Sequence, residues 1–181
     1  MRDARPTPRS EPPPLDVKRI VSTLDTHGVH YLLIGGLGAT LYGAERVTQD
    51  IDLLPRTDAE NLSRLAAALR DLGAFLRVGG LTDDEARELP VVIDGRSLGA
   101  TEVTTWRTEA GDLDVLATIR GEHGEFRKYA DLIDRASETV VTGVTVRVAS
   151  LQDIVESKRF AGRDKDHDAL PELERLLEQG D

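Results

Sequence analysis

The chain contains no cysteine among its 181 residues. Disulfide bonds, thiolate metal sites and cysteine nucleophiles are therefore excluded. The sequence also has no apolar run approaching the roughly 20 residues that a membrane-spanning helix needs, and its N-terminus lacks the apolar core of a signal peptide. These absences predict a soluble, cytoplasmic protein that has no membrane partner.

Aromatic residues make up only 4% of the chain, so a core must be built mainly from Leu, Val, Ile and Ala. The length of 181 residues predicts one domain, with at most a small extension. The net charge of -10 disfavours a protein whose main task is to coat DNA or RNA, because nucleic acid repels an acidic surface. An enzyme with a local basic groove and a protein that binds a basic partner both remain possible.

Hydrophobic periodicity predicts a mixed α/β (α+β) fold with a small mixed sheet and C-terminal helices. Residues 1–14, rich in Pro and Arg, are predicted to form a disordered tail before a domain over residues 15–148. Residues 149–181 are predicted to form a helical part packed on that domain. The expected helices cover residues 16–27, 37–42, 59–72, 126–136, 151–160 and 170–177. The expected strands cover residues 31–34, 48–54, 74–78, 91–93, 98–106, 113–119 and a hairpin at 139–148.

Two aspartates stand two residues apart in the segment Asp50-Ile51-Asp52. A strand points residues i and i+2 to the same side, so both carboxylates face one spot while Ile51 faces a core. Two such carboxylates repel each other unless a cation lies between them, and hard oxygen ligands suit Mg²⁺ or Mn²⁺. The alternative interpretation is a charged, solvent-facing strand edge.

A third carboxylate and a glycine pair complete this pattern. Asp114 lies between Leu113 and Val115, so it projects away from the core side of a strand and is a candidate ligand for the metal that activates a nucleophile. Asp112 better fits a loop-edge residue at the strand start. Gly35-Gly36 follows an apolar strand and precedes a short helix, where backbone N–H groups can bind phosphate. Divalent metal and a phosphate cradle together favour phosphoryl or nucleotidyl transfer.

The C-terminal segment 158–168 mixes positive and negative side chains densely. Lys158 and Arg163 are predicted to lie near triphosphate oxygens, where cations offset developing charge. Asp166 is predicted to orient one of these cations through a charge-assisted hydrogen bond, and Arg46 is a further candidate for phosphate. The alternative for this segment is a solvated linker between helices. The four histidines show no metal-ligand spacing.

The joint motif set resembles the nucleotidyltransferase superfamily, whose fold is that of DNA polymerase β. Gly35-Gly36, Asp50-x-Asp52 and Asp114 carry this resemblance. The detailed motifs are similar to those of the AbiEii-like and MenT-type toxins of toxin–antitoxin systems, over roughly residues 29–170. These motifs are Ile34-Gly-Gly-x-x-Ala39, Arg46-x-Thr48-x-Asp50-Ile-Asp52-Leu-Leu and Ser150-Leu-x-Asp153-x-x-x-x-Lys158-x-x-Ala161-x-Arg163-x-Lys165-Asp166.

The resemblance implies a toxin that transfers nucleotides from an NTP to the 3′ end of tRNA, which blocks aminoacylation and translation. It implies catalytic roles for Asp50, Asp52, Asp114, Lys158 and Asp166. It implies metal binding by Asp50, Asp52 and Asp114. It implies nucleotide binding by Gly35, Gly36, Arg46, Thr48, Lys158 and Arg163.

The resemblance also implies a cognate antitoxin, which in some pairs is a kinase. Thr48 is then a possible phosphorylation site, where phosphate would add a charge of about -1.5 to -2. Two alternatives remain open. One is nucleotidyl transfer to a small molecule or to a protein side chain (AMPylation), and the other is a non-catalytic, antitoxin-like module.

Overall fold

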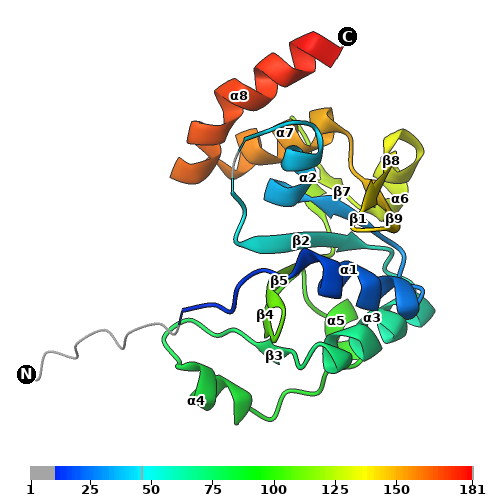
Figure 1. Cartoon of the computed structure of the whole chain (residues 1–181), viewed down its shortest axis with the longest axis vertical. Helices are drawn as coiled ribbons and strands as arrows, with labels where there is room; N and C mark the ends of the chain where they lie inside the picture. Colours follow the sequence, from blue (N-terminus) through cyan, green and yellow to red (C-terminus); the bar gives the residue numbers. More distant parts are fainter. Residues whose placement is uncertain (1–10, 46, 181) are drawn as a thin grey trace, which may run out of the picture.

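The computed structural model describes residues 11–45 and 47–180, which form a mixed α/β structure (Figure 1). A seven-stranded sheet has the strand order β3-β4-β5-β2-β1-β9-β8, and a two-stranded sheet pairs β6 with β7. The large sheet contains β1 (Tyr31–Ile34), β2 (Asp50–Pro55), β3 (Phe75–Leu76), β4 (Val103–Thr108), β5 (Gly111–Leu116), β8 (Ser137–Val141) and β9 (Val144–Val148). The small sheet contains β6 (Ile119–Arg120) and β7 (Phe126–Arg127).

The helices lie between these strands and at the C-terminal end of the chain. They are α1 (Val17–Thr26), α2 (Gly35–Leu41), α3 (Ala59–Asp71), α4 (Asp83–Arg87), α5 (Gly95–Gly99), α6 (Tyr129–Leu132), the 3₁₀ helix η1 (Ile133–Arg135), α7 (Leu151–Ala161) and α8 (Asp164–Gly180). Figure 1 shows α7 and α8 at one end of the molecule and α4 at the other. Among the described residues, no helix is long and apolar enough to cross a membrane.

The centre of the large sheet positions the candidate site. Strand β2 pairs antiparallel with β1 and parallel with β5. Its residues Ile51 and Leu53 are fully buried, whereas Asp50 and Asp52, which alternate with them, stay partly exposed. This is the predicted alternation, and it sends one face of β2 into the core and the other to the carboxylate site.

A single hydrophobic core holds the central strands and the helices together. Ile20 and Leu24 of α1 and Leu65 of α3 are fully buried in the same cluster as the inward side chains of β2. N-terminal caps fix where these helices begin: the side chain of Asp16 caps α1 and that of Asp58 caps α3. The mixed α/β fold with C-terminal helices is therefore confirmed.

The segment between α3 and β4 differs from the prediction. Strands were expected over residues 91–93 and 98–106, but the chain forms helix α5 before β4 begins at Val103. The cause is a reciprocal cap, because Ser97 N donates to the Asp94 carboxylate at 2.7 Å and Asp94 N donates to Ser97 Oγ at 3.2 Å. This local cap stabilises a helical turn that the β-branched neighbours do not suggest.

The prediction is also wrong over residues 113–136. The expected strand ends at Leu116, and the expected helix begins only at Tyr129. Between them β6 and β7 form a small hairpin whose turn requires the positive φ of Gly124, at 80°. The guanidinium of Arg120 lies 3.3 Å from the centre of the Phe126 ring and stabilises this pairing.

The C-terminal charged segment is helical rather than a linker. Helix α7 ends at Ala161 and is capped by Gly162, which has a left-handed backbone with φ of 57°, and α8 starts two residues after this cap. Acidic residues in the first turn of α8 favour this start, since they complement the helix dipole. The predicted division of the chain after residue 148 stays a prediction, and the predicted tail lies mostly outside the described residues.

Asn61 of α3 offers a stability test of the fold. It is fully buried, accepts from His30 N at 2.7 Å, and donates to the carbonyl oxygens of His30 at 2.8 Å and Arg56 at 2.7 Å. We expect Asn61→Ala to lower the free energy of unfolding by about 2–4 kcal/mol, because the three hydrogen bonds of this buried side chain to the backbone are lost and a cavity is left in their place. Urea denaturation measures this. Ser63→Ala, at an exposed position of the same helix, is the control, and an equal loss in both variants would contradict the role of Asn61.

Candidate active site

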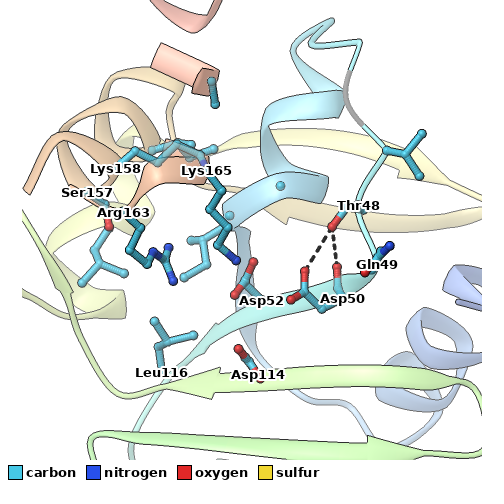
Figure 2. A pocket seen from close by; sticks show the side chains of 17 residues that line it. Thr48, Gln49, Asp50, Asp52, Asp114, Leu116, Ser157, Lys158, Arg163 and Lys165 are labelled. Atoms are coloured by element: carbon cyan, nitrogen blue, oxygen red, sulfur yellow. Dashed lines mark hydrogen bonds between the residues drawn. The ribbon is translucent and has the colours of Figure 1, made fainter. Parts of the chain in front are cut away.

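A cavity of about 310 Å³ opens where the start of β2, strand β5, helix α2 and the α7–α8 junction meet (Figure 2). The predicted residues that line it are Gly35, Gly36, Thr48, Asp50, Asp52, Asp114, Lys158 and Arg163. Segments far apart in the sequence thus converge on one cavity. Arg46, predicted to contact phosphate, lies outside the described residues.

The pairing of β2 with β5 brings the carboxylates together. The two strands run parallel, with Asp50 beside Asp112 and Asp52 beside Asp114. All four residues therefore lie on the same face of adjacent strands. Figure 2 shows Asp50, Asp52 and Asp114 grouped at the floor of the cavity.

The crowding of these carboxylates changes their proton affinity. Burial, followed by the charges of Asp50 and Asp114, raises the pKa of Asp52 to about 6, although Lys165 and Lys158 oppose the shift. Burial also raises the pKa of Asp114, against a hydrogen bond from Thr105. Both carboxyl groups therefore bind a proton more tightly than an exposed aspartate does, because burial and the neighbouring negative charge disfavour the ionised form.

The two glycines allow the chain to approach the carboxylates closely. Gly35 has a φ of 63°, and a Cβ atom there would lie 1.8 Å from Oδ2 of Asp52. A Cβ atom on Gly36 would lie 2.9 Å from Oγ1 of Thr48. The glycine pair is therefore required by packing against the site as well as by the turn into α2.

Cations from the C-terminal helices form the opposite wall. Asp166 is fully buried and binds Nζ of Lys158 at 3.2 Å and Nε of Arg163 at 2.6 Å. Burial opposes ionisation of Asp166, but Arg163 and Lys158 outweigh it and lower its pKa. Asp166 does not line the cavity, so it is a positioning residue for the two cations and not a group that touches substrate.

Lys165 was missed as a site residue by sequence reasoning. It lines the cavity, and Figure 2 shows its side chain reaching toward Asp52. Its charge lowers the pKa of Asp52. The available signal was its position two residues after Arg163 in the same charged segment, but only the start of α8 shows which charges face inward.

Thr48 is held by its neighbour Asp50. Its hydroxyl lies 2.8 Å from the main-chain oxygen of Asp50 and 3.2 Å from Oδ1 of the same residue. A phosphate at Thr48 would replace this donor with negative charge beside a carboxylate. Phosphorylation itself stays a prediction. Measuring the intact mass of the protein after co-expression with a cognate antitoxin kinase would test it.

The donor set fits a divalent cation that is shared with a substrate. Asp50 and Asp52 are hard oxygen ligands on the same face of β2, and the pKa of Asp52 is raised by burial and then by negative charge that a cation would offset. In the part of the chain described, no group of three or more His, Asp or Glu side chains is placed to hold a metal ion. Mg²⁺ commonly uses one or two carboxylates together with phosphate oxygens and water, so the pair suffices. Asp114 as a third ligand stays a prediction.

Solved structures with the same fold are antibiotic-modifying enzymes and related proteins. A lincomycin-bound lincosamide antibiotic adenylyltransferase, LnuA, aligns with a TM-score of 0.54 at 18% identity, over 90% of this chain and 99% of that chain. ANT(2'')-Ia in complex with adenylyl-2''-tobramycin aligns with a TM-score of 0.52 at 17% identity, over 88% and 91%. A putative nucleotidyltransferase from Thermotoga maritima aligns with a TM-score of 0.52 at 17% identity, over 86% and 88%.

The fold is that of the nucleotidyltransferases, a class of transferase enzymes. Within this class, residues 16–176 match the family model described as aminoglycoside-2''-adenylyltransferase, and the chain belongs to that family. No curated protein matches the sequence. The predicted superfamily is thereby confirmed, whereas the resemblance to AbiEii-like toxins stays a prediction.

Gly35 provides a test of the close approach at the site. We expect Gly35→Ala to lower the rate of nucleotidyl transfer by at least about tenfold, because the new methyl group must displace the Asp52 carboxylate and occupy a left-handed backbone position. Steady-state kinetics measures the loss, with far-UV circular dichroism to confirm folding. Gly143→Ala is the control, since its φ is also positive and nothing lies within 4 Å of its Cβ position. Equal activity losses in both variants would contradict the steric argument.

Asp52 provides a test of the charge crowding. Its pKa is raised from 3.8 to about 6, so the metal-free folded state binds this proton more tightly than the unfolded state does. The resulting stability is present at pH 4 and is lost as pH rises through about 6. We therefore expect metal-free Asp52→Asn to be more stable than wild type at pH 8, on the order of 2 kcal/mol, and similar to it at pH 4. Urea unfolding in EDTA measures both, and a difference independent of pH would refute the assignment.

Proposed function

We propose that this protein is a Mg²⁺-dependent nucleotidyltransferase that moves the adenylyl group of ATP to a hydroxyl of a small molecule. One observation carries the proposal: a single cavity is lined by three carboxylates and two cations, namely Asp50, Asp52, Asp114, Lys158 and Arg163. Membership of an adenylyltransferase family supports ATP as the donor. The retention of all three carboxylates weighs against a non-catalytic, antitoxin-like module.

In this proposal Asp50 and Asp52 would hold Mg²⁺ together with the triphosphate. The metal would supply Lewis-acid stabilisation of charge on the phosphates. The acceptor hydroxyl forms a bond to the α-phosphorus, the bond from that phosphorus to the bridging oxygen breaks, and pyrophosphate leaves. Asp114 takes the hydroxyl proton, a role that its raised pKa favours.

The glycine pair and the cations act on the triphosphate. Gly35 and Gly36 line the cavity at the start of α2, where their N–H groups would bind the β- and γ-phosphates. Lys158 and Arg163, fixed by Asp166, offset the charge that develops on departing pyrophosphate. Positioning and charge neutralisation supply most of the rate in such reactions.

The small acceptor is favoured over tRNA by two observations. The chain carries a net charge of -10, which opposes binding of a large polyanion. Its family is named for transfer to a small molecule. The tRNA 3′ end, with a toxin role and a cognate antitoxin, is the second candidate, supported by the motif set that runs through Lys165 and Asp166. AMPylation of a protein is a further outcome that the same assay detects.

We expect purified protein with Mg²⁺ and α-³²P-ATP to label a small acceptor from a hydroxyl-compound panel, and Asp50→Ala and Asp114→Ala to reduce labelling by about 10³-fold or more. Thin-layer chromatography and gels separate small products, tRNA and protein, and each other NTP is tested in parallel. Asp71→Asn, an exposed aspartate that contacts His27, is the control.

Each other labelling pattern identifies a different reaction. Asp50-dependent label in tRNA would establish the second candidate, and a labelled protein band would establish AMPylation. If wild type labels nothing with any NTP while the protein is folded, the proposal of nucleotidyl transfer is wrong and the non-catalytic interpretation replaces it.

A further inference from the structure

A second cavity shares three residues with the first, namely Gln49, Asp50 and Asp114, but Lys158 and Arg163 do not line it. Its volume is about 530 Å³, which falls within the range of about 300–1,000 Å³ that is typical of small-molecule sites. The proposed reaction brings the acceptor and the triphosphate together at the carboxylates. The second cavity is therefore the place for the acceptor.

Acidic side chains outnumber cations in the lining of this cavity. The acidic side chains are those of Asp50, Asp83, Asp112 and Asp114, and the cations are Arg77 and Arg107. Both arginines are engaged within the protein, since Arg107 binds Asp83 and Asp112 and Arg77 also binds Asp112. The lining therefore favours a neutral or cationic hydroxyl compound over an anion.

The first described residues of the chain supply one wall of the second cavity. Pro12 lines it, together with residues 78–81, which lead into α4. Figure 1 shows the start of the described chain beside that loop. Pro12 is exposed, so its ring is open to a molecule that occupies the cavity.

Contacts at the turn between β4 and β5 hold this wall in place. The main-chain N–H of Asp16 donates to the carbonyl oxygen of Ala110 at 2.8 Å. Leu15 packs so closely on Gly111 that a Cβ atom there would lie 2.9 Å from Cδ1 and 3.0 Å from Cα of Leu15. Gly111 directly precedes Asp112 of the cavity lining. The anchor of the wall thus adjoins the cavity itself.

A run of prolines connects this anchor to the cavity. Pro12, Pro13 and Pro14 directly precede Leu15. Proline fixes its own φ at about -65°, so such a run favours a stiff and extended polyproline II segment. The position of Pro12 is therefore set before a ligand binds, and binding need not order the wall.

The wall is not implied by membership of the family. The family match covers residues 16–176, and this range contains the carboxylates and the cations described above. Residues 12–15 precede it. The contact that Pro12 makes with the cavity is thus a feature of this chain in addition to the family's own site.

We infer that residues 12–15 form an acceptor-selecting wall of the second cavity, in which Pro12 contacts the acceptor and residues 13–15 position Pro12. This inference rests on the proposed function, because it assigns part of the acceptor site of that reaction. The acceptor that fits is a neutral or cationic hydroxyl compound with an apolar ring face. The proline ring offers C–H surface without a hydrogen-bond donor, and the carboxylates accept from hydroxyl or ammonium groups.

Tobramycin, whose adenylyl derivative is bound in the ANT(2'')-Ia structure, is a cationic probe with several hydroxyl groups. It is titrated into the full chain by ligand-observed NMR, with Mg²⁺ and a non-hydrolysable ATP analogue present. We expect Pro12→Ala to weaken its binding at least about fivefold, because one or two buried CH₂ groups are lost. The double substitution Pro13→Gly and Pro14→Gly should weaken it by a similar factor, because Pro12 must then be ordered when the ligand binds.

Pro90→Ala is the matched control. Pro90 is also exposed, and it does not line the cavity, so this variant should bind tobramycin as the wild type does. Equal affinity in the wild type and in both proline variants of the wall would overturn the inference. An equal loss in Pro90→Ala, or no binding of tobramycin to the wild type, would overturn it as well.

A spin label locates the bound probe, since the absence of cysteine allows one labelled site per variant. Glu11→Cys places a nitroxide beside Pro12, and Gln179→Cys places one near the end of α8, at the end of the molecule opposite to α4 (Figure 1). We expect the first label to broaden the resonances of bound tobramycin and the second to leave them sharp. The reverse pattern would place the probe outside the second cavity and contradict the wall.

Binding of the ATP analogue alone separates this inference from the proposed function. No proline lines the first cavity, so every proline variant should bind the analogue as the wild type does. If the analogue binds while the wall variants leave tobramycin binding unchanged, only the wall is wrong. Failure of the analogue to bind the wild type would count against nucleotidyl transfer itself, and the wall would fall with it.

Discussion

The repulsion among carboxylates on two neighbouring strands is the constraint around which this molecule is organised. The parallel register of β2 and β5 sets Asp50 beside Asp112 and Asp52 beside Asp114 on one face. Uncompensated, this arrangement destabilises the folded state. The protein relieves it unequally, since Arg77 and Arg107 both pair with Asp112, while Asp52 is buried beside other carboxylates and keeps a raised pKa. A carboxylate that pairs with arginine has a structural role, and a carboxylate without such a pair is available for chemistry.

The same constraint explains features on both flanks of the carboxylate cluster. On one side, Gly35 permits the backbone of α2 to touch the Asp52 carboxylate, and the buried Asp166 holds two cations toward the cavity. On the other side, Arg107 ties α4 and its preceding loop to the sheet through Asp83. The carboxylates thus lie beside the cations Lys158 and Arg163 on one flank and beside Arg77 and Arg107 on the other.

The fold was predictable where local signals agreed with burial. The strand at β1 and the alternation in β2 follow directly from apolar pattern, and helices α1 and α3 from their caps and periodicity. The prediction failed where a local hydrogen bond or turn overrides pattern. The Asp94–Ser97 cap makes a helix of a strand-like segment, and the turn at Gly124 replaces a helix with a hairpin. Such effects depend on single side chains and on neighbours that are far away in sequence.

By itself, the sequence determined the superfamily, the mixed fold and the chemical identity of the site, because Asp-x-Asp on a strand and a glycine pair before a helix are local patterns with a direct physical meaning. Only the tertiary structure decided which charges face the cavity. It turned Lys165 inward, placed Asp166 beneath its two cations, and paired Asp112 with Arg107 of β4 and with Arg77, which follows β3. The reason is that partner choice among charged side chains depends on strand register and helix docking, which long-range packing sets and no short segment encodes.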